Sequence, residues 1–143
     1  MGGGLFGKEG ESEDSRVLLD GILTIAPSSK LSLMANYDYG KEGDATWNAL
    51  SIYAKLQASD KVAFSPRFEI LDDSDGFATL TEQKLSSFTL TSEVKIGGGL
   101  LTRLDLRLDH SDEEVFASDI ADEFKEDQFT ATVGLVYAFG GKI

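Results

Sequence analysis

Residues 100–109 read LLTRLDLRLD, the most regular alternation of apolar and charged side chains in the chain. Leucine occupies every second position from Leu104 to Leu108, and Asp105 and Arg107 fill the positions between them. A period of two places successive side chains on opposite faces of an extended strand. These residues therefore predict a β-strand with one apolar face and one charged face.

The same alternation recurs along most of the chain. Six further segments show it, at about residues 16–26, 31–39, 46–58, 62–70, 88–96 and 129–139. Tilted strands of roughly this length can cross the hydrocarbon core of a membrane. Pro66 lies inside one of the segments, and because proline has no N–H to donate, we expect a local break in the ladder there.

Connections of two kinds join these segments. Short turns are expected at 27–30, 59–61 and 97–99, and longer polar loops at 40–45, 72–83 and 110–126. Outer-membrane barrels join their strands by such an alternation of tight turns and long loops. The expected fold is thus all-β, an antiparallel up-and-down transmembrane β-barrel of about eight strands, seven of them visible.

An odd number of strands does not close a bacterial barrel. Leu5 and Phe6 could belong to the stump of an eighth strand, strands could be missing, or several chains could combine. The predicted organisation is an N-terminal extension or residual loop at 1–14, the barrel at 15–139 and a C-terminal tail at 140–143.

Composition excludes several function classes. The formal charge of −12 leaves no basic patch for nucleic acid, and the absence of cysteine excludes disulfides and thiolate chemistry. No run reaches the roughly 18 apolar residues of a transmembrane helix. The start, Met1 to Gly4, has the look of a processed or engineered N-terminus rather than of a signal peptide.

The charged faces of the predicted strands are the candidate site. In a closed barrel they would line the lumen; the residues concerned are Arg16, Asp20, Asp38, Lys55, Arg67, Glu69, Glu93, Lys95, Arg103, Asp105, Arg107 and Asp109. An eight-stranded barrel would be filled by these side chains as ion pairs. A wider barrel would leave them as a selectivity lining.

The loop around residue 75 resembles a calcium loop in part. Asp73, Asp75, Gly76 and Glu82 stand at its third, fifth, sixth and twelfth positions, but Leu71 at the first cannot coordinate. We expect a solvated acidic loop, with weak calcium binding through Asp73, Asp75 and Glu82 as the alternative.

The longest loop is strongly acidic, through Asp112, Glu113, Glu114, Asp119, Asp122, Glu123, Glu126 and Asp127. The charges fit a solvated outer loop, a mouth that attracts cations, or divalent bridging to lipopolysaccharide. Phe116, Ile120 and Phe124 recur every four residues around Ser118, which predicts a short amphipathic helix.

His110 and Ser111 suggest a hydrolase site, because some outer-membrane barrels modify lipids. Adjacent residues on a strand face opposite ways, however, so the two side chains would not meet as base and nucleophile. We expect no catalytic residue, no enzyme activity and no cofactor.

The segments resemble the C-terminal part of the OmpL-like bacterial β-barrel porins. The resemblance lies in KLSLMANYDYG (30–40), SDKVAFSPRFE (59–69), DDSDG (72–76), LDLRLDHS (104–111) and DQFTATVGLVYAF (127–139). It implies a passive diffusion channel in the bacterial outer membrane. Members of the family are larger, so the chain would match a truncated or engineered barrel, or a small relative.

The leading expectation is a porin-like outer-membrane channel for small solutes or ions. Its partners would be the lipid bilayer and lipopolysaccharide, with a homo-oligomer as one way to complete the barrel. A small structural or engineered barrel that does not conduct, its lumen filled by salt bridges, is the first alternative. A soluble lipocalin-like binder is the second.

Overall fold

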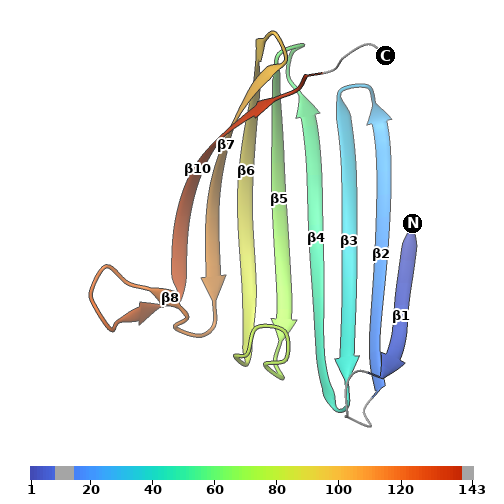
Figure 1. Ribbon diagram of the computed structural model, residues 1–143, viewed down its shortest axis with the longest axis vertical. Coiled ribbons are helices and arrows are strands. Elements are labelled where there is room, and N and C mark those ends of the chain that lie inside the picture. Colours follow the sequence, from blue (N-terminus) through green and yellow to red (C-terminus); the bar gives the residue numbers. More distant parts are fainter. Residues whose placement is uncertain (9–14, 140–143) are drawn as a thin grey trace.

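The computed structural model describes residues 1–8 and 15–139, which form β-strands and loops with no helix among them (Figure 1). The described residues accordingly contain no helix long and apolar enough to cross a membrane. The strands are β1 (Gly2–Lys8), β2 (Ser15–Ser28), β3 (Leu31–Glu42), β4 (Ala45–Gln57), β5 (Val62–Asp73), β6 (Gln83–Gly97), β7 (Leu100–Ser111), β8 (Phe116–Ala117), β9 (Phe124–Lys125) and β10 (Asp127–Tyr137).

Eight of the strands form one antiparallel meander in the order β1-β2-β3-β4-β5-β6-β7-β10. This confirms the predicted all-β, antiparallel, up-and-down arrangement. Within the described residues, the edge strands β1 and β10 do not pair with each other, and Figure 1 shows them at opposite ends of the sheet. The structure therefore presents an open eight-stranded sheet, and not the closed barrel that was predicted.

The eighth strand is β1, which the expected boundaries left outside the barrel. Residues Gly2–Lys8 pair with β2, for example Phe6 with Val17, so the prediction of a separate extension at 1–14 is wrong for this part. The alternative that Leu5 and Phe6 belong to an eighth strand holds. The remainder of that extension and the predicted tail at 140–143 lie outside the described residues.

The short turns lie where they were predicted, and small residues explain them. The hydroxyl of Ser28 accepts the backbone N–H of Leu31 at 3.2 Å, and that of Ser59 accepts the N–H of Val62 at 3.2 Å. Gly98 and Gly99 have φ of 59° and 85°, a region that favours glycine. These turns gather at the upper end of the sheet in Figure 1.

One predicted loop is a tight turn instead. The expected loop at 40–45 is reduced to residues 43–44, because β3 continues to Glu42, which pairs with Ala45. Gly43 supplies the positive φ, at 58°, that this two-residue hairpin needs. The alternation of short and long connections is therefore less strict than predicted.

Pro66 interrupts the sheet on one side only. The pairing of β4 with β5 passes from Tyr53–Arg67 directly to Leu56–Phe64, whereas Pro66 stays opposite Leu90 on β6. The predicted local break is confirmed, and its cause is the missing N–H of proline.

The predicted helix in the longest loop is wrong. Phe116 and Phe124 belong to the two-stranded ribbon of β8 and β9, in which Phe116 pairs with Lys125 and Ala117 with Phe124. Asp122 has φ of 64°, which a helix does not allow. Like charges three or four residues apart, as at Asp119, Asp122 and Glu123, also destabilise a helix.

Candidate functional site

The pairing register places the predicted lining residues on one face of the sheet, called here the polar face. Directly paired residues share a face, so the register can be followed from Asp38–Ala49 through the next strands to Glu93–Arg103. All twelve lie on this face: Arg16, Asp20, Asp38, Lys55, Arg67, Glu69, Glu93, Lys95, Arg103, Asp105, Arg107 and Asp109.

The opposite face is apolar and exposed. Ile52, Phe68, Phe88, Leu108 and Phe129 are successive partners in a row that crosses five strands. Each of them is between 43% and 61% exposed. An apolar row of this kind is what the outside of a membrane barrel presents to lipid.

Burial is reversed relative to a soluble protein, in which apolar residues are the most buried. Among the described residues, Gly40 and Ala63 are the only buried ones that are not polar. The others are Asp73, Gln83, Ser87, Thr89, Glu93 and Ser111. The enclosed side of the sheet is therefore its polar side.

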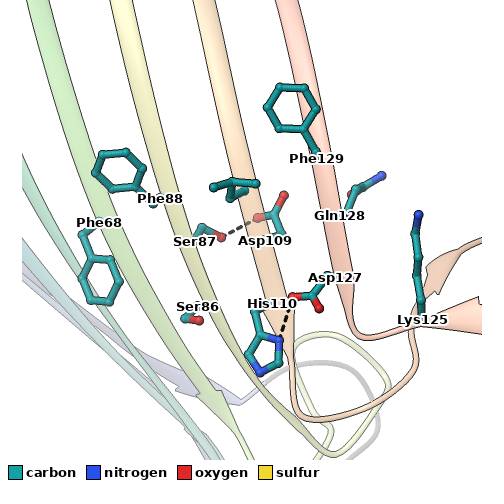
Figure 2. A pocket seen from close by; sticks show the side chains of 11 residues that line it. Phe68, Ser86, Ser87, Phe88, Asp109, His110, Lys125, Asp127, Gln128 and Phe129 are labelled. Atoms are coloured by element: carbon teal, nitrogen blue, oxygen red, sulfur yellow. Dashed lines mark hydrogen bonds and ion pairs between the residues drawn. The ribbon is translucent and has the colours of Figure 1, made fainter.

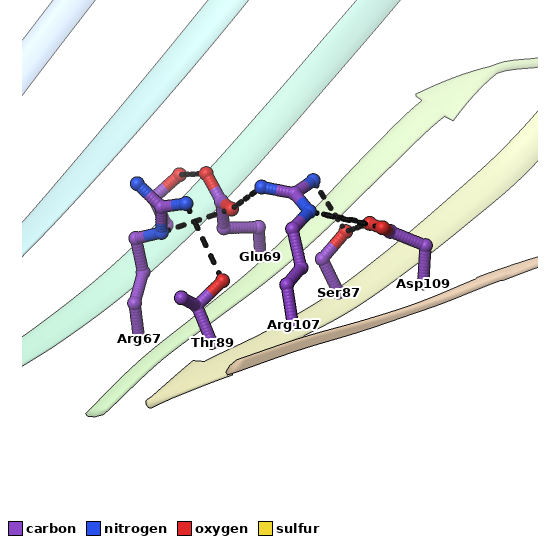
Figure 3. A network of polar contacts seen from close by, with 7 residues as sticks. Arg67, Glu69, Ser87, Thr89, Arg107 and Asp109 are labelled. Carbon is purple, nitrogen blue, oxygen red and sulfur yellow. Dashed lines mark hydrogen bonds and ion pairs between the residues drawn. The ribbon is translucent and has the colours of Figure 1, made fainter. Parts of the chain in front are cut away.

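A network centred on Arg107 occupies the middle of the polar face (Figure 3). The Nε of Arg107 lies 2.8 Å from Oδ1 of Asp109, and its Nη1 lies 3.3 Å from Oε2 of Glu69. Its Nη2 donates to Oγ of Ser87 at 2.9 Å, and that hydroxyl in turn donates to Asp109. One guanidinium thus joins side chains from β5, β6 and β7.

Arg67 extends this network toward β4 and β6. Its Nε lies 3.0 Å from Oε2 of Glu69, an ion pair that lacks hydrogen-bond geometry. Its Nη2 donates to Oγ1 of Thr89 at 3.4 Å, and the guanidinium carbon lies 5.9 Å from the ring centre of Tyr53. Glu69 is therefore shared by two arginines.

A second group surrounds Glu93, nearer the short turns. Its carboxylate accepts from Nζ of Lys55 at 2.8 Å and from Nη2 of Arg103 at 2.5 Å. Glu93 is 8% exposed, so both cations hold a buried charge in place. Lys95 lies on the same face and has no ion-pair partner among the described residues.

Elsewhere on the polar face the charges are less well matched. Asp20 lies directly opposite Asp38, whose Oδ2 accepts from Nδ2 of Asn36 at 2.6 Å. Asp105 has a buried Oδ1 without a hydrogen-bond partner. Arg16, by contrast, forms an ion pair with Glu42.

Asp73 organises the loop that was considered for calcium. It is fully buried, and its carboxylate accepts the backbone N–H groups of Phe77, Ala78 and Thr79 at 2.7–3.1 Å. The oxygens of Asp73 are thus occupied by the loop itself.

The two other calcium candidates do not join Asp73. Asp75 accepts from the backbone N and the hydroxyl of Thr46, at 2.8 and 2.9 Å. The described residues contain no group of three or more acidic or histidine side chains that could hold a metal ion, so Asp73, Asp75 and Glu82 are not brought together as a ligand set.

The two residues considered for hydrolysis lie on opposite faces. Ser111 is fully buried and donates to Oε1 of Gln83 at 2.9 Å. His110 lies on the other face, in a hollow of about 520 Å³, where its Nδ1 is 2.9 Å from Oδ1 of Asp127 (Figure 2). As expected from their adjacency on a strand, His110 and Ser111 do not meet.

Some contributors to the network were missing from the predicted lining. Ser87, Thr89 and Ser51 hold its charged members, the last with its hydroxyl 3.5 Å from Oε1 of Glu69. Their position in the alternation was the available signal, since each has the same parity as the charged residues of its strand. Glu42 was assigned to a loop, so its pairing with Arg16 was not foreseen.

The comparisons with known proteins agree with this arrangement. A family model described as "Putative beta-barrel porin-2, OmpL-like" matches residues 3–139, nearly the whole chain. No curated protein and no solved structure matches it. The match includes β1 and every strand of the main sheet. The chain therefore belongs to the OmpL-like family of β-barrel porins.

Proposed function

We propose that the chain forms a porin-like β-barrel in the bacterial outer membrane, through which small solutes or ions diffuse passively. Its polar face would line the lumen, and its apolar face would contact lipid. We propose no catalytic step and no cofactor for this role.

The reversed burial is the single observation that carries the proposal. A continuous apolar row is exposed, while Ser87, Thr89 and Glu93 are buried on the opposite side. In water such a surface would associate or aggregate, but in a bilayer it is solvated by acyl chains. A soluble lipocalin-like binder would need the opposite distribution, with an apolar interior.

A second candidate is a structural barrel that does not conduct. The Arg107 network supports it, because ion pairs and hydroxyls already fill the middle of the polar face. If eight strands closed alone, their side chains would occupy the lumen. A conducting pore requires more strands, from another copy or from a longer chain.

The proposed partners follow from the apolar face, the acidic loop and the two edges of the sheet. The bilayer would cover the apolar face. The acidic loop of residues 112–126 would extend outward, where divalent cations could link its carboxylates to the phosphates of lipopolysaccharide. Within the described residues β1 and β10 are the edges of the sheet, and each would accept a strand from a second copy, which gives a homo-oligomer.

Conductance in a planar lipid bilayer tests the proposal. The refolded protein is added to the bilayer, and its insertion is checked by protection of the strands from protease. Stable ohmic steps are expected from an open lumen. Inserted protein that leaves the bilayer silent would favour the structural barrel and contradict the channel.

A further inference from the structure

We propose that the polar face carries a binding site for a small multivalent oxyanion, such as phosphate or a dicarboxylate. The site lies at the short-turn end of the sheet and is formed by Lys61 and Lys95 with Lys55. The inference deepens the proposed function, on which it rests for the assignment of the anion as a passing solute.

Lys61, the last residue of the turn before β5, lies opposite Lys95 of β6. The backbone N–H of Lys95 donates to the carbonyl of Lys61 at 2.8 Å, one position beyond the pair Val62–Val94. Like charges directly opposite each other destabilise a sheet. An anion between the two ammonium groups would remove that cost.

The surroundings do not neutralise these two lysines. The hollow of about 130 Å³ that they line also contains Lys55 and Glu93. Glu93 is already shared by Lys55 and Arg103, at 2.8 and 2.5 Å. Within residues 1–8 and 15–139, Lys61 and Lys95 have no ion-pair partner.

Three lysines and one carboxylate therefore line the hollow, and that carboxylate also pairs with Arg103, in a chain whose formal charge is −12. This local excess of positive charge contrasts with the acidic loops at the other end of the sheet. Because exposed like charges that lack a counterion repel, the arrangement favours an anion supplied from solution.

The size of the hollow and the chemistry of its cations favour a small anion. The hollow has a volume of about 130 Å³. Ammonium groups act as point charges without the planar fork of arginine, so they select charge rather than shape. A phosphate or a short dicarboxylate meets these conditions.

The wall of the hollow is held in place by the turn before β5. Nε2 of Gln57 donates to the carbonyls of Ser59 and Val62, at 2.5 and 3.2 Å. These bonds fix the backbone on both sides of Lys61. The site is thus built on a braced turn, which reduces the ordering that binding would require.

A lipid headgroup shares the chemistry of phosphate, but the position favours a solute. The lysines lie on the polar face, whereas their neighbours Val62 and Val94 point to the apolar face. An anion would therefore reach the hollow from the polar side of the sheet, which is the side proposed to line the lumen.

The test is calorimetric titration of the full chain with inorganic phosphate, in a non-ionic detergent and at constant ionic strength. We expect saturable binding. Removing one charge, in Lys61→Gln or Lys95→Gln, should weaken binding about fivefold, because a single solvated charge contact is lost. The double variant should bind no phosphate, and the double arginine variant, which keeps both charges, should bind it.

Lys84→Gln is the matched control, because it removes an exposed lysine at the loop end, where it pairs with Asp72 at 2.9 Å. It should bind phosphate as the parent does. Equal affinity of the parent and the double glutamine variant would overturn the site, and so would an equal loss in the control. Trp47 fluorescence verifies that each variant is folded.

Two further arms separate this inference from its neighbours. If the protein binds phosphate but does not conduct, the anion site stands and the proposed channel is contradicted. If it conducts but does not bind phosphate, the channel stands and the anion site is contradicted. A third outcome is that the protein binds no phosphate but prefers phosphatidylglycerol vesicles to phosphatidylcholine vesicles, and loses this preference in the double glutamine variant. That outcome would assign the lysines to a lipid headgroup and overturn the solute site.

Discussion

Replacing Arg107 by methionine should lower the free energy of unfolding by about 2 kcal/mol. Methionine keeps much of the length and the apolar stem of arginine but cannot donate to the carboxylates. The change removes the contacts of Arg107 with Asp109, Glu69 and Ser87.

The magnitude follows from burial and from the partners that remain. Breaking a fully buried ion pair costs roughly 3–5 kcal/mol, because it leaves a buried charge uncompensated. The side chain of Arg107 is 37% exposed, so water screens part of this loss. Glu69 keeps Arg67, and Asp109 keeps the hydroxyl of Ser87. These partners reduce the expected cost to ~2 kcal/mol.

Urea unfolding in phosphatidylcholine vesicles measures the effect. The chain has one tryptophan, Trp47 on β4, whose fluorescence reports unfolding. The unfolding free energies of the parent, Arg107→Met and Arg107→Lys are compared, provided that the three proteins show the same slope of free energy against urea concentration. Lysine keeps the charge but cannot reach all three partners, so its variant should lie between the other two.

Lys84→Met is the matched control, because Lys84 makes one exposed ion pair with Asp72. Its stability should stay within about 0.5 kcal/mol of the parent. If Arg107→Met lost no more than this control, the network would not stabilise the polar face, and the reasoning from shared partners would be refuted.

Three further changes test the faces and the loop. Gly40→Ala should lower the free energy of unfolding by about 1–3 kcal/mol in the urea assay and alter Trp47 fluorescence, because the new methyl would collide with the indole ring. Leu106→Arg should cost about 2–4 kcal/mol in vesicles, since it puts a charge on the lipid-facing side. Its neighbour on the polar face, Asp105→Asn, should be neutral, because one buried oxygen of Asp105 is unpaired; equal losses at the two positions would contradict the assignment of faces. Asp73→Ala should free three backbone N–H groups and make the following loop sensitive to protease, and unchanged cleavage would speak against its role.

The strands could be predicted because the signal is local. In β7 leucine occupies every second position from Leu104 to Leu108, and this period is maintained whatever the neighbouring strands are. The strand β1 could not be found in this way, since GGGLFGK has no alternation and is placed by its pairing with β2. A helix was expected around Phe116 because Phe116, Ile120 and Phe124 are spaced four residues apart. The same spacing arises here because Phe116 and Phe124 lie on the two strands of a short hairpin.

The candidate site was predictable as a face but not as a set of contacts. The parity of Arg67, Glu69 and Arg107 put them on one side, and the structure has them there. Which carboxylate each arginine meets depends on the register between strands, and parity alone does not supply it.

The sequence by itself determined seven of the eight strands of the main sheet, their two faces and most of the turns, because each depends on residues close together in the chain. Only the tertiary structure decided that Arg107 lies between Glu69 and Asp109, and that Lys61 faces Lys95. Pairing joins residues that are tens of positions apart, and its register is set by turn geometry and by the ladder as a whole. The same alternating pattern would be satisfied by other registers, in which different charges would meet.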